Sequence, residues 1–328
     1  MTPRPGSQQW LGLAKEVTYG TPIAAPTMWI PVDSPKWDPN VTPLVDSALR
    51  GMMATDYGQT QGMRYDSLSY KTGIYADTIF PHLIAILGGA DTMTGAADPY
   101  THKTSLNNAA SSTLNGQPPS YTGFLYQLDG KVVQIPGMII SDLKISIKAN
   151  TLPTVDATWM GLPGVFITAP TNTPSTVPPM PPFTAAITVG GVAATQYSDC
   201  SFDIKRTAEA VPVLNGTQSP LAIFAGPLTV TGTLLAIYQG SADLDLTRLL
   251  ANTQPTLSVS IYQQGDATHP LTLQCSKIAY DTASPSGSNT SYATISSGFK
   301  AIANATDALD GKLSPIQAII LNAQSTAY

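Results

Sequence analysis

The sequence predicts a mainly β protein, a β-sandwich or half-barrel with one flanking helix, and it predicts that this unit occurs twice in tandem. Apolar and polar residues alternate over strand-length runs, as at Leu143, Ile145 and Ile147. Helical spacing is confined to two short stretches, one in each half of the chain. Each stretch follows a strand-like run with an internal glycine, and the two units lie about half the chain apart, which indicates an internal duplication.

The first strand–helix unit covers residues 68–89 (LSYKTGIYADTIFPHLIAILGG). Asp77 or Thr78 can cap the helix through a side-chain oxygen. Pro81 favours Thr78, because that cap places the proline in the first turn, where its missing N–H has no intrahelical partner. Gly88 and Gly89 are expected to end the helix by allowing a left-handed backbone. The apolar helix face consists of Ile79, Phe80, Leu83, Ile84 and Leu87.

The second unit covers residues 228–252 (LTVTGTLLAIYQGSADLDLTRLLAN). Ser241 is expected to cap its helix, and Asp243 and Asp245 complement the positive helix start, which explains them without a catalytic role. Asn252 takes the position of the terminating glycine. The buried face is expected to consist of Leu246, Leu249 and Leu250.

A proline-rich run at residues 169–182 (APTNTPSTVPPMPP) is typical of a semi-rigid linker and marks the boundary between the halves. After the two helices, the runs YTGFLYQLDG and LSVSIYQQGD occupy matching places. We therefore expect an N-terminal arm at 1–30, a first β domain at 31–168, the linker at 169–183, a second β domain at 184–303 and a C-terminal arm at 304–328. Residues 46–66 are too polar and too rich in glycine to be core, and they predict a protruding hairpin or loop.

The composition limits the kinds of function. Charged residues make up 11% of the chain, against about 25% in ordinary soluble domains, which suits a surface covered by copies of the same protein. A Thr/Ser-rich β protein that is merely low in charge is the alternative. The net charge of −5 argues against gripping nucleic acid through phosphates. No signal-peptide pattern or run of about 20 apolar residues is present, so we expect synthesis and folding in the cytoplasm, with Cys200 and Cys275 as free buried thiols.

Catalytic sequence motifs are absent: the chain has no nucleophile elbow, phosphate loop, dinucleotide fingerprint or zinc-binding pair. His82 lies between apolar helix residues and is expected to be a structural histidine, while His102 and His269 are expected at the surface. The four tryptophans are expected to be core or interface anchors rather than a sugar-stacking platform. We therefore expect no enzyme activity, no cofactor and no metal.

Several short motifs, taken in order, resemble the major tail proteins (tail tube proteins) of long-tailed, non-contractile bacteriophages, the siphophages. The resemblance covers most of the chain. Its motifs are residues 12–22 (GLAKEVTYGTP), 32–34 (VDS), 46–51 (DSALRG), 87–89 (LGG), 98–102 (DPYTH), 106–108 (LNN), 141–145 (SDLKI) and 198–202 (SDCSF).

The resemblance implies a structural virion protein that assembles into stacked rings, which form a hollow tube for genome delivery. It implies the tape-measure protein and the tail terminator and initiator proteins as partners, and double-stranded DNA that passes without specific binding. It also implies a location in the phage tail after assembly in the host bacterial cytoplasm. Through this resemblance, the duplication predicts rings of three chains with pseudo-six-fold symmetry.

Applied to this chain, the resemblance makes residues 50–64 and their second-half counterpart, 209–227, candidates for contacts between rings. The expected inter-subunit residues are Arg50, Met52, Met53, Tyr57, Met63, Arg64, Leu214 and Phe224. Two other classes remain open at this point. One is another self-assembling structural protein, such as a capsid decoration, fibre or surface-layer subunit; the other is a β-sandwich carbohydrate-binding module.

Overall fold

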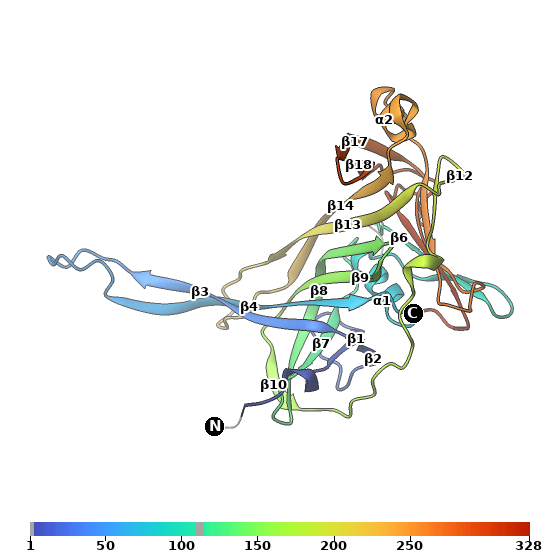
Figure 1. The fold of residues 1–328 in the computed structure, drawn as a ribbon. Helices are drawn as coiled ribbons and strands as arrows, with labels where there is room; N and C mark the ends of the chain where they lie inside the picture. Colours follow the sequence, from blue (N-terminus) through green and yellow to red (C-terminus); the bar gives the residue numbers. More distant parts are fainter. Residues whose placement is uncertain (1–2, 109–114) are drawn as a thin grey trace.

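The computed structural model describes residues 3–108 and 115–328, and that part of the chain is mainly antiparallel β structure with two short α-helices (Figure 1). The predicted fold class is confirmed. The longest strands build a continuous layer of eight strands in the order β3-β4-β9-β8-β13-β14-β18-β17. Their bounds are β3 Asp33–Asp46, β4 Gly58–Gly73, β8 Lys131–Lys148, β9 Thr151–Gly161, β13 Tyr197–Ala210, β14 Ile223–Ile237, β17 Ile278–Ser288 and β18 Ser291–Ala301.

Shorter strands extend this layer and form a second sheet. The first half of β8 also pairs with β7 and β10, and β7 leads on to β1 and β2. The second sheet has the order β12-β11-β15-β16-β19-β6-β5. The bounds are β1 Leu11–Lys15, β2 Met28–Ile30, β5 Thr92–Thr94, β6 Tyr100–Ser105, β7 Tyr121–Tyr126, β10 Val165–Thr168, β11 Ala186–Val189, β12 Val192–Ala193, β15 Leu257–Ile261, β16 Leu271–Cys275 and β19 Gln317–Asn322.

The strand pairings of the first half recur in the second. The hairpins β1·β2 and β3·β4 correspond to β11·β12 and β13·β14, and the contacts of β4 with β9 and of β1 with β7 correspond to β14·β18 and β11·β15. The long strand β8 corresponds to β16 and β17 together. It pairs with β7, β10 and β9, as β16 and β17 pair with β15, β19 and β18. Strands β5 and β6 have no such counterpart among the described strands.

The two final hairpins match residue by residue. In β8·β9 the register shifts after Ile140 and again after Ser146, and in β17·β18 it shifts after Tyr280 and after Ser286. The sequence distance from Ile140 to Tyr280 is the same as that from Ser146 to Ser286. Because bulges break a ladder at one place, their coincidence at a constant spacing shows that the two hairpins are built on the same plan.

The core lies on one side of the eight-stranded layer and draws on both halves. One cluster of buried residues runs from Leu11 to Ile320 and includes most of the first helix, α1 (Ile79–Leu87). This helix packs against β8 and β13, and the second helix, α2 (Leu244–Leu250), packs against β17. Since the two halves share one sheet and one core cluster, the proposed division into domains 31–168 and 184–303 stays a prediction.

The helix ends show which local predictions hold. Thr78 is at the N-cap of α1, but its side chain makes no capping hydrogen bond; Gly88 does end the helix with a left-handed backbone (φ 78°). In α2 the cap is Asp243, whose carboxylate accepts from two backbone N–H groups, rather than Ser241. Leu250 is 78% exposed, so the expected buried face of α2 is wrong at that residue.

The segments expected as arms lie partly inside the fold. Strand β1 belongs to the large sheet, with Leu11 and Leu13 buried, and β19 lies between β16 and β6 in the second sheet. Both segments meet their partners through non-local strand pairing, which local composition does not reveal. The expected hairpin at 46–66 does project, as the outer part of β3 and β4 (Figure 1).

Candidate assembly surfaces

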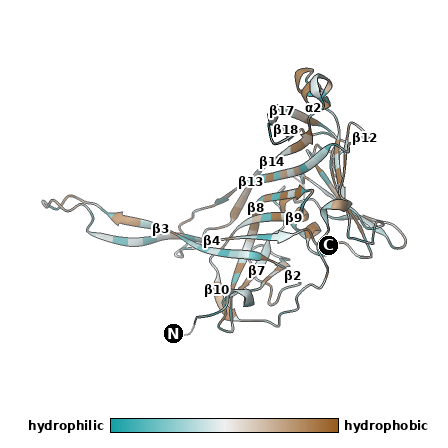
Figure 2. Cartoon of the chain, in the orientation of Figure 1, coloured by the Kyte–Doolittle hydropathy of each residue, from teal (hydrophilic) through white to brown (hydrophobic). Residues whose placement is uncertain are grey.

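The hairpin of β3 and β4 is the most extended surface feature. Its tip carries exposed apolar side chains: Leu49 and Met53 are fully exposed and Met52 is 64% exposed. Apolar residues near the end of β3 stand out in the hydropathy view (Figure 2). Exposed apolar side chains on a projecting hairpin are typical of a segment that another chain covers.

The tip is nevertheless ordered by its own contacts. Arg50 forms an ion pair with Asp46 and lies 4.6 Å from the ring centroid of Tyr57, and the Tyr57 hydroxyl donates to the Ala54 carbonyl oxygen at 2.7 Å. Arg50, Met52, Met53 and Tyr57 therefore lie together at the tip, and their role in contacts between subunits stays a prediction.

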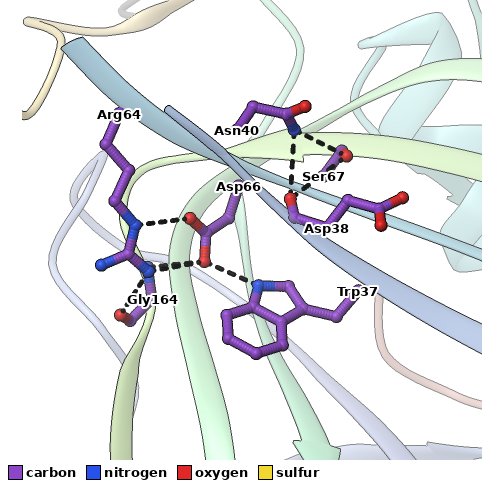
Figure 3. A network of polar contacts seen from close by, with 7 residues as sticks. All are labelled: Trp37, Asp38, Asn40, Arg64, Asp66, Ser67 and Gly164. Atoms are coloured by element: carbon purple, nitrogen blue, oxygen red, sulfur yellow. Dashed lines mark hydrogen bonds and ion pairs between the residues drawn. The ribbon is translucent and has the colours of Figure 1, made fainter. Parts of the chain in front are cut away.

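A buried carboxylate fixes the root of the hairpin (Figure 3). Asp66 is fully buried, and its oxygens accept hydrogen bonds from Trp37 Nε1 at 2.7 Å, from Gly164 N at 3.0 Å and from Arg64 at 3.1 and 3.2 Å. Arg64 also donates to the Gly164 carbonyl oxygen at 3.2 Å. Arg64, expected at a subunit contact, is thus engaged within its own chain; only knowledge that β4 runs beside residue 164 could have shown this.

The hairpin of β13 and β14 presents a second exposed end. Leu214 is fully exposed and Phe224 is half exposed, and their role as contact residues stays a prediction. The Arg64 backbone N–H donates to the Gln218 carbonyl oxygen at 2.8 Å, which ties this hairpin to the first. Met63 packs between the two against Ile139, Ala210, Ile223 and Ala225, so it belongs to a small internal cluster rather than to free surface.

The face of the eight-stranded layer that points away from the core is polar and electrically balanced. One row of paired positions crosses seven strands and alternates in charge almost throughout. Its members are Asp33, Lys71, Asp156, Lys144, Asp203, Thr231 and Lys300. Opposite charges on neighbouring strands attract and largely cancel, so this face offers no net positive footprint for phosphates.

Ion pairs in the middle of this face join the two halves. Lys205 Nζ lies 2.8 Å from an oxygen of Asp203 on its own strand and 3.5 Å from an oxygen of Asp142 on β8. Partial burial and the neighbouring Asp203 raise the pKa of Asp142, while the hydrogen bond to Asp203 raises the pKa of Lys205. All three side chains are partly solvated, so the pairs contribute little stability.

The layer ends in two strands, β3 and β17, that have no strand partner on their outer sides within the described residues. Prolines occur on both: Pro35, Pro39 and Pro43 on β3, and Pro285 on β17. Proline suits such edges because it cannot donate to a ladder, and it protects an edge from unwanted pairing.

The histidines lie outside these surfaces. His82 is buried, 2.6 Å from the Tyr70 hydroxyl and 2.7 Å from the Thr78 carbonyl oxygen, and burial lowers its pKa to about 4, so it is structural as predicted. His102 is also fully buried, with Nδ1 2.6 Å from Asp91 and Nε2 2.9 Å from the Gln324 carbonyl oxygen. The expectation of a surface role for His102 is therefore wrong, because β19 and the C-terminal residues cover it.

The remaining expectations concern chemistry. Cys200 and Cys275 are free and buried, as predicted. A surface hollow of about 480 Å³ lies beside Trp29, Tyr75 and Leu152. Residues 3–108 and 115–328 contain no group of three or more side chains that could hold a metal ion. The arrangement thus offers edges and projecting hairpins for contact, while its histidine–carboxylate pairs support loops and the C-terminal end.

None of the described helices is long and apolar enough to cross a membrane. The model of one protein family, described as phage tail tube protein, matches residues 6–305. A comparison with curated proteins finds no match.

Proposed function

Since the chain belongs to the phage tail tube protein family, a structural family that forms the tube of a virion, we propose that three copies close into a ring and that rings stack into the hollow tube that delivers the genome. The observation that carries this proposal is the repeated half: β3-β4-β9-β8 and β13-β14-β18-β17 are two equivalent four-stranded blocks side by side. The rotation that relates the first block to the second within a chain can also relate the second block to the first block of the next chain. Contacts of this head-to-tail kind close into rings.

The size of the layer favours three chains. With strands about 4.8 Å apart and tilted by about 40°, three eight-stranded layers close a cylinder with a backbone diameter of roughly 50 Å. Side chains occupy about 5 Å on each side, half the spacing of packed sheets, which leaves a lumen of roughly 40 Å, enough for a DNA duplex. Six chains would close a cylinder about twice as wide.

The polar face of the layer is the surface that we propose for the lumen. Both helices and the core cluster lie on the opposite face of the layer. That opposite face therefore points to the outside of the ring. A wall on which Lys71 and Lys144 alternate with Asp33, Asp156 and Asp203, and on which Lys300 follows Thr231, holds water and has little net charge. Such a wall lets phosphates slide instead of gripping them, because strong binding needs a cluster of unpaired cations.

The projecting hairpins are the surfaces that we propose for contacts between rings. The tip of the first carries Arg50, Met52, Met53 and Tyr57, and the second carries Leu214 and Phe224. Methionine side chains adapt to irregular partner surfaces. We also place the tape-measure protein inside the tube, and the terminator and initiator proteins at its ends, in a tail of the siphophage type.

The experiment is electron microscopy of the purified full-length chain, alone and after concentration. Hollow filaments of constant diameter are expected, with end-on views of short stacks that show a central hole. A chain that forms solid fibres or a flat lattice under every assembly condition would overturn the proposal and return the alternative of a surface-layer or fibre subunit.

A further inference from the structure

We propose that neighbouring chains of the ring are joined by β17 of one copy and β3 of the next, antiparallel and in the register that the chain already uses between β8 and β13. This inference rests on the proposed ring. It specifies which residues face each other across the joint.

The internal joint is the model for the external one. The second half of β8 corresponds to β17 at a constant sequence spacing, with both register shifts in the same places. Strand β13 corresponds to β3: Trp37 lies opposite Leu68, which pairs with Trp159, and Phe202 lies opposite Gly232, which pairs with Phe299. The chain therefore contains, at β8·β13, one complete joint of the kind that its two free edges lack.

The correspondence fixes the register. In the internal joint Lys144 lies opposite Asp203. The equivalent positions at the free edges are Ser284 on β17 and Asp38 on β3, so these two residues are expected opposite each other across the ring joint. Both are accessible: Ser284 is exposed and the Asp38 side chain is 46% exposed.

Backbone polarity also follows from the internal joint. The Ala149 N–H donates to the Ser198 carbonyl oxygen at 2.9 Å. Because hydrogen-bonded pairs alternate along an antiparallel ladder, Ile145 and Phe202 also form such a pair. Their equivalents, Pro285 and Trp37, therefore direct their backbone groups into the ring joint.

The prolines fit this arrangement because they do not oppose each other. Pro285 faces Trp37, whose N–H is free to donate to the Pro285 carbonyl oxygen. In the next hydrogen-bonded pair along the strands Ala283 faces Pro39, and the Ala283 N–H donates to the Pro39 carbonyl oxygen. Each of these two pairs keeps one backbone hydrogen bond of the usual two, so the ring joint has fewer hydrogen bonds than β8·β13. Because each edge strand contains proline, it also resists pairing with strands of other proteins.

Side-chain burial points the same way. On the core side of the internal joint, Ile145 and Phe202 are fully buried. At the free edges the equivalent Pro285 is exposed and Trp37 is half-buried, and Phe166, which packs edge-on against Trp37, is 62% exposed. These apolar groups lack the cover that their equivalents have, and a second copy of the chain in this register supplies it.

The experiment is disulfide trapping in assembled tubes. The chain with Asp38→Cys and Ser284→Cys should form disulfides between chains under mild oxidation, since directly opposite residues of a non-hydrogen-bonded pair have the closest Cβ atoms. The matched control carries Lys36→Cys and Thr282→Cys, on the same strands and face but out of register, about 13 Å apart along the strand. The natural thiols are buried in both variants.

The expected result on a non-reducing denaturing gel is covalent dimers and trimers from the first variant, at a yield at least ten times that of the control. Tubes that form normally and give no cross-link in the first variant, or equal cross-links in both, overturn this joint while leaving the tube function standing. Failure of the unmodified chain to form any ring or tube, in the virion or after purification, removes the proposed function and this joint with it. Single-cysteine variants show whether either position cross-links by collision.

Discussion

Trp159 and Phe299 occupy the same place in the two halves of the chain. Trp159 pairs with Ile140 directly before a register shift, and Phe299 pairs with Tyr280 directly before the equivalent shift in the second half. Both rings are buried. Their partners on the other side differ in size, because Trp159 lies opposite Leu68 and Phe299 opposite Gly232. The second half has thus kept the plan of the first while exchanging the side chains that fill it.

Gly232 gives the first prediction. A Cβ atom there would overlap the Ser201 carbonyl oxygen and the Phe299 ring. Gly232→Ala should therefore lower the free energy of unfolding by about 1–3 kcal/mol, the usual range for overpacking, measured by chemical denaturation. Gly287→Ala is the matched control, since a Cβ at that position in β17 meets only open space and the Ala293 methyl at 4.0 Å. Equal stability of the two variants would show that Phe299 can move aside.

The buried carboxylate at the hairpin root gives the second prediction. Asp66→Asn keeps the size of the side chain but removes the charge that pairs with Arg64. In either orientation its amide nitrogen faces a donor: Trp37 Nε1 and Gly164 N at one position, or Arg64 Nε at the other. A loss of about 1–3 kcal/mol in unfolding free energy is expected for leaving such donors unpaired, with altered Trp37 fluorescence. Asp38→Asn, in an exposed ion pair with Lys36, should change stability by less than about 0.5 kcal/mol. Equal effects of the two changes would contradict the role given to Asp66.

His82 gives a prediction about pH. Burial lowers its pKa from 6.5 to about 4, so the unfolded chain binds the proton more tightly than the folded one. The stability due to neutral His82 is complete above pH 6.5 and is lost as pH falls towards 4, by about 3 kcal/mol in total. Relative to His82→Gln, the natural chain should therefore lose stability over this interval, measured by denaturation at each pH. A constant difference between the two chains would contradict the assignment.

His269 is the control for that experiment, because its pKa moves the other way. Protonated His269 donates hydrogen bonds to the carboxylates of Asp266 and Asp98, which raises its pKa, so its contribution to stability is present at low pH and is lost as pH rises through the folded value. The site is largely exposed, so His269→Gln should leave the acid dependence between pH 6.5 and 4 essentially as it is.

Much of the local structure was predictable from the sequence, because it depends on nearby residues. The apolar spacing of 79–87, the left-handed Gly88 and the left-handed Asn252 (φ 50°) follow from short-range rules. The choice between Ser241 and Asp243 as the cap of α2 does not follow from such rules, since both side chains can accept from backbone N–H groups at the helix start. The surrounding structure decides between them. His102 was misplaced because its cover, the segment around Gln324, belongs to the opposite end of the chain.

The assembly surfaces were predictable only in part. Glycine and polar residues around Arg50 and Met53 indicated a projecting segment, and the hairpin does project. Met63 and Arg64 lie in the same segment but turn inward, towards Ile223 and Asp66, because β4 meets other strands there. The pairing of β8 with β13 has no local sequence signal, because it joins strands from different halves of the chain. These two strands also share little sequence with their equivalents at the free edges, β17 and β3.

The hairpin tip gives the fourth prediction. Replacing residues 45–59 with Asn-Gly joins Leu44 to Thr60, which already face each other, through a two-residue turn that suits a hairpin. The shortened chain should keep its melting temperature within a few degrees, because the tip contributes no core, and should form rings that do not stack. Electron microscopy measures both ring and tube length. Tubes of normal length would show that rings are held together elsewhere.

The rotational symmetry of the tube shows whether three two-unit chains close each ring. Cryo-electron microscopy of assembled tubes, without imposed symmetry, counts the chains in one ring and resolves the wall of the lumen. We expect three chains per ring, a pseudo-six-fold wall in which the internal β8·β13 joint alternates with a β17·β3 joint, and a lumen of roughly 40 Å. Rings of six complete chains, or a wall in which the two halves of each chain are not related by the same rotation, would contradict this expectation.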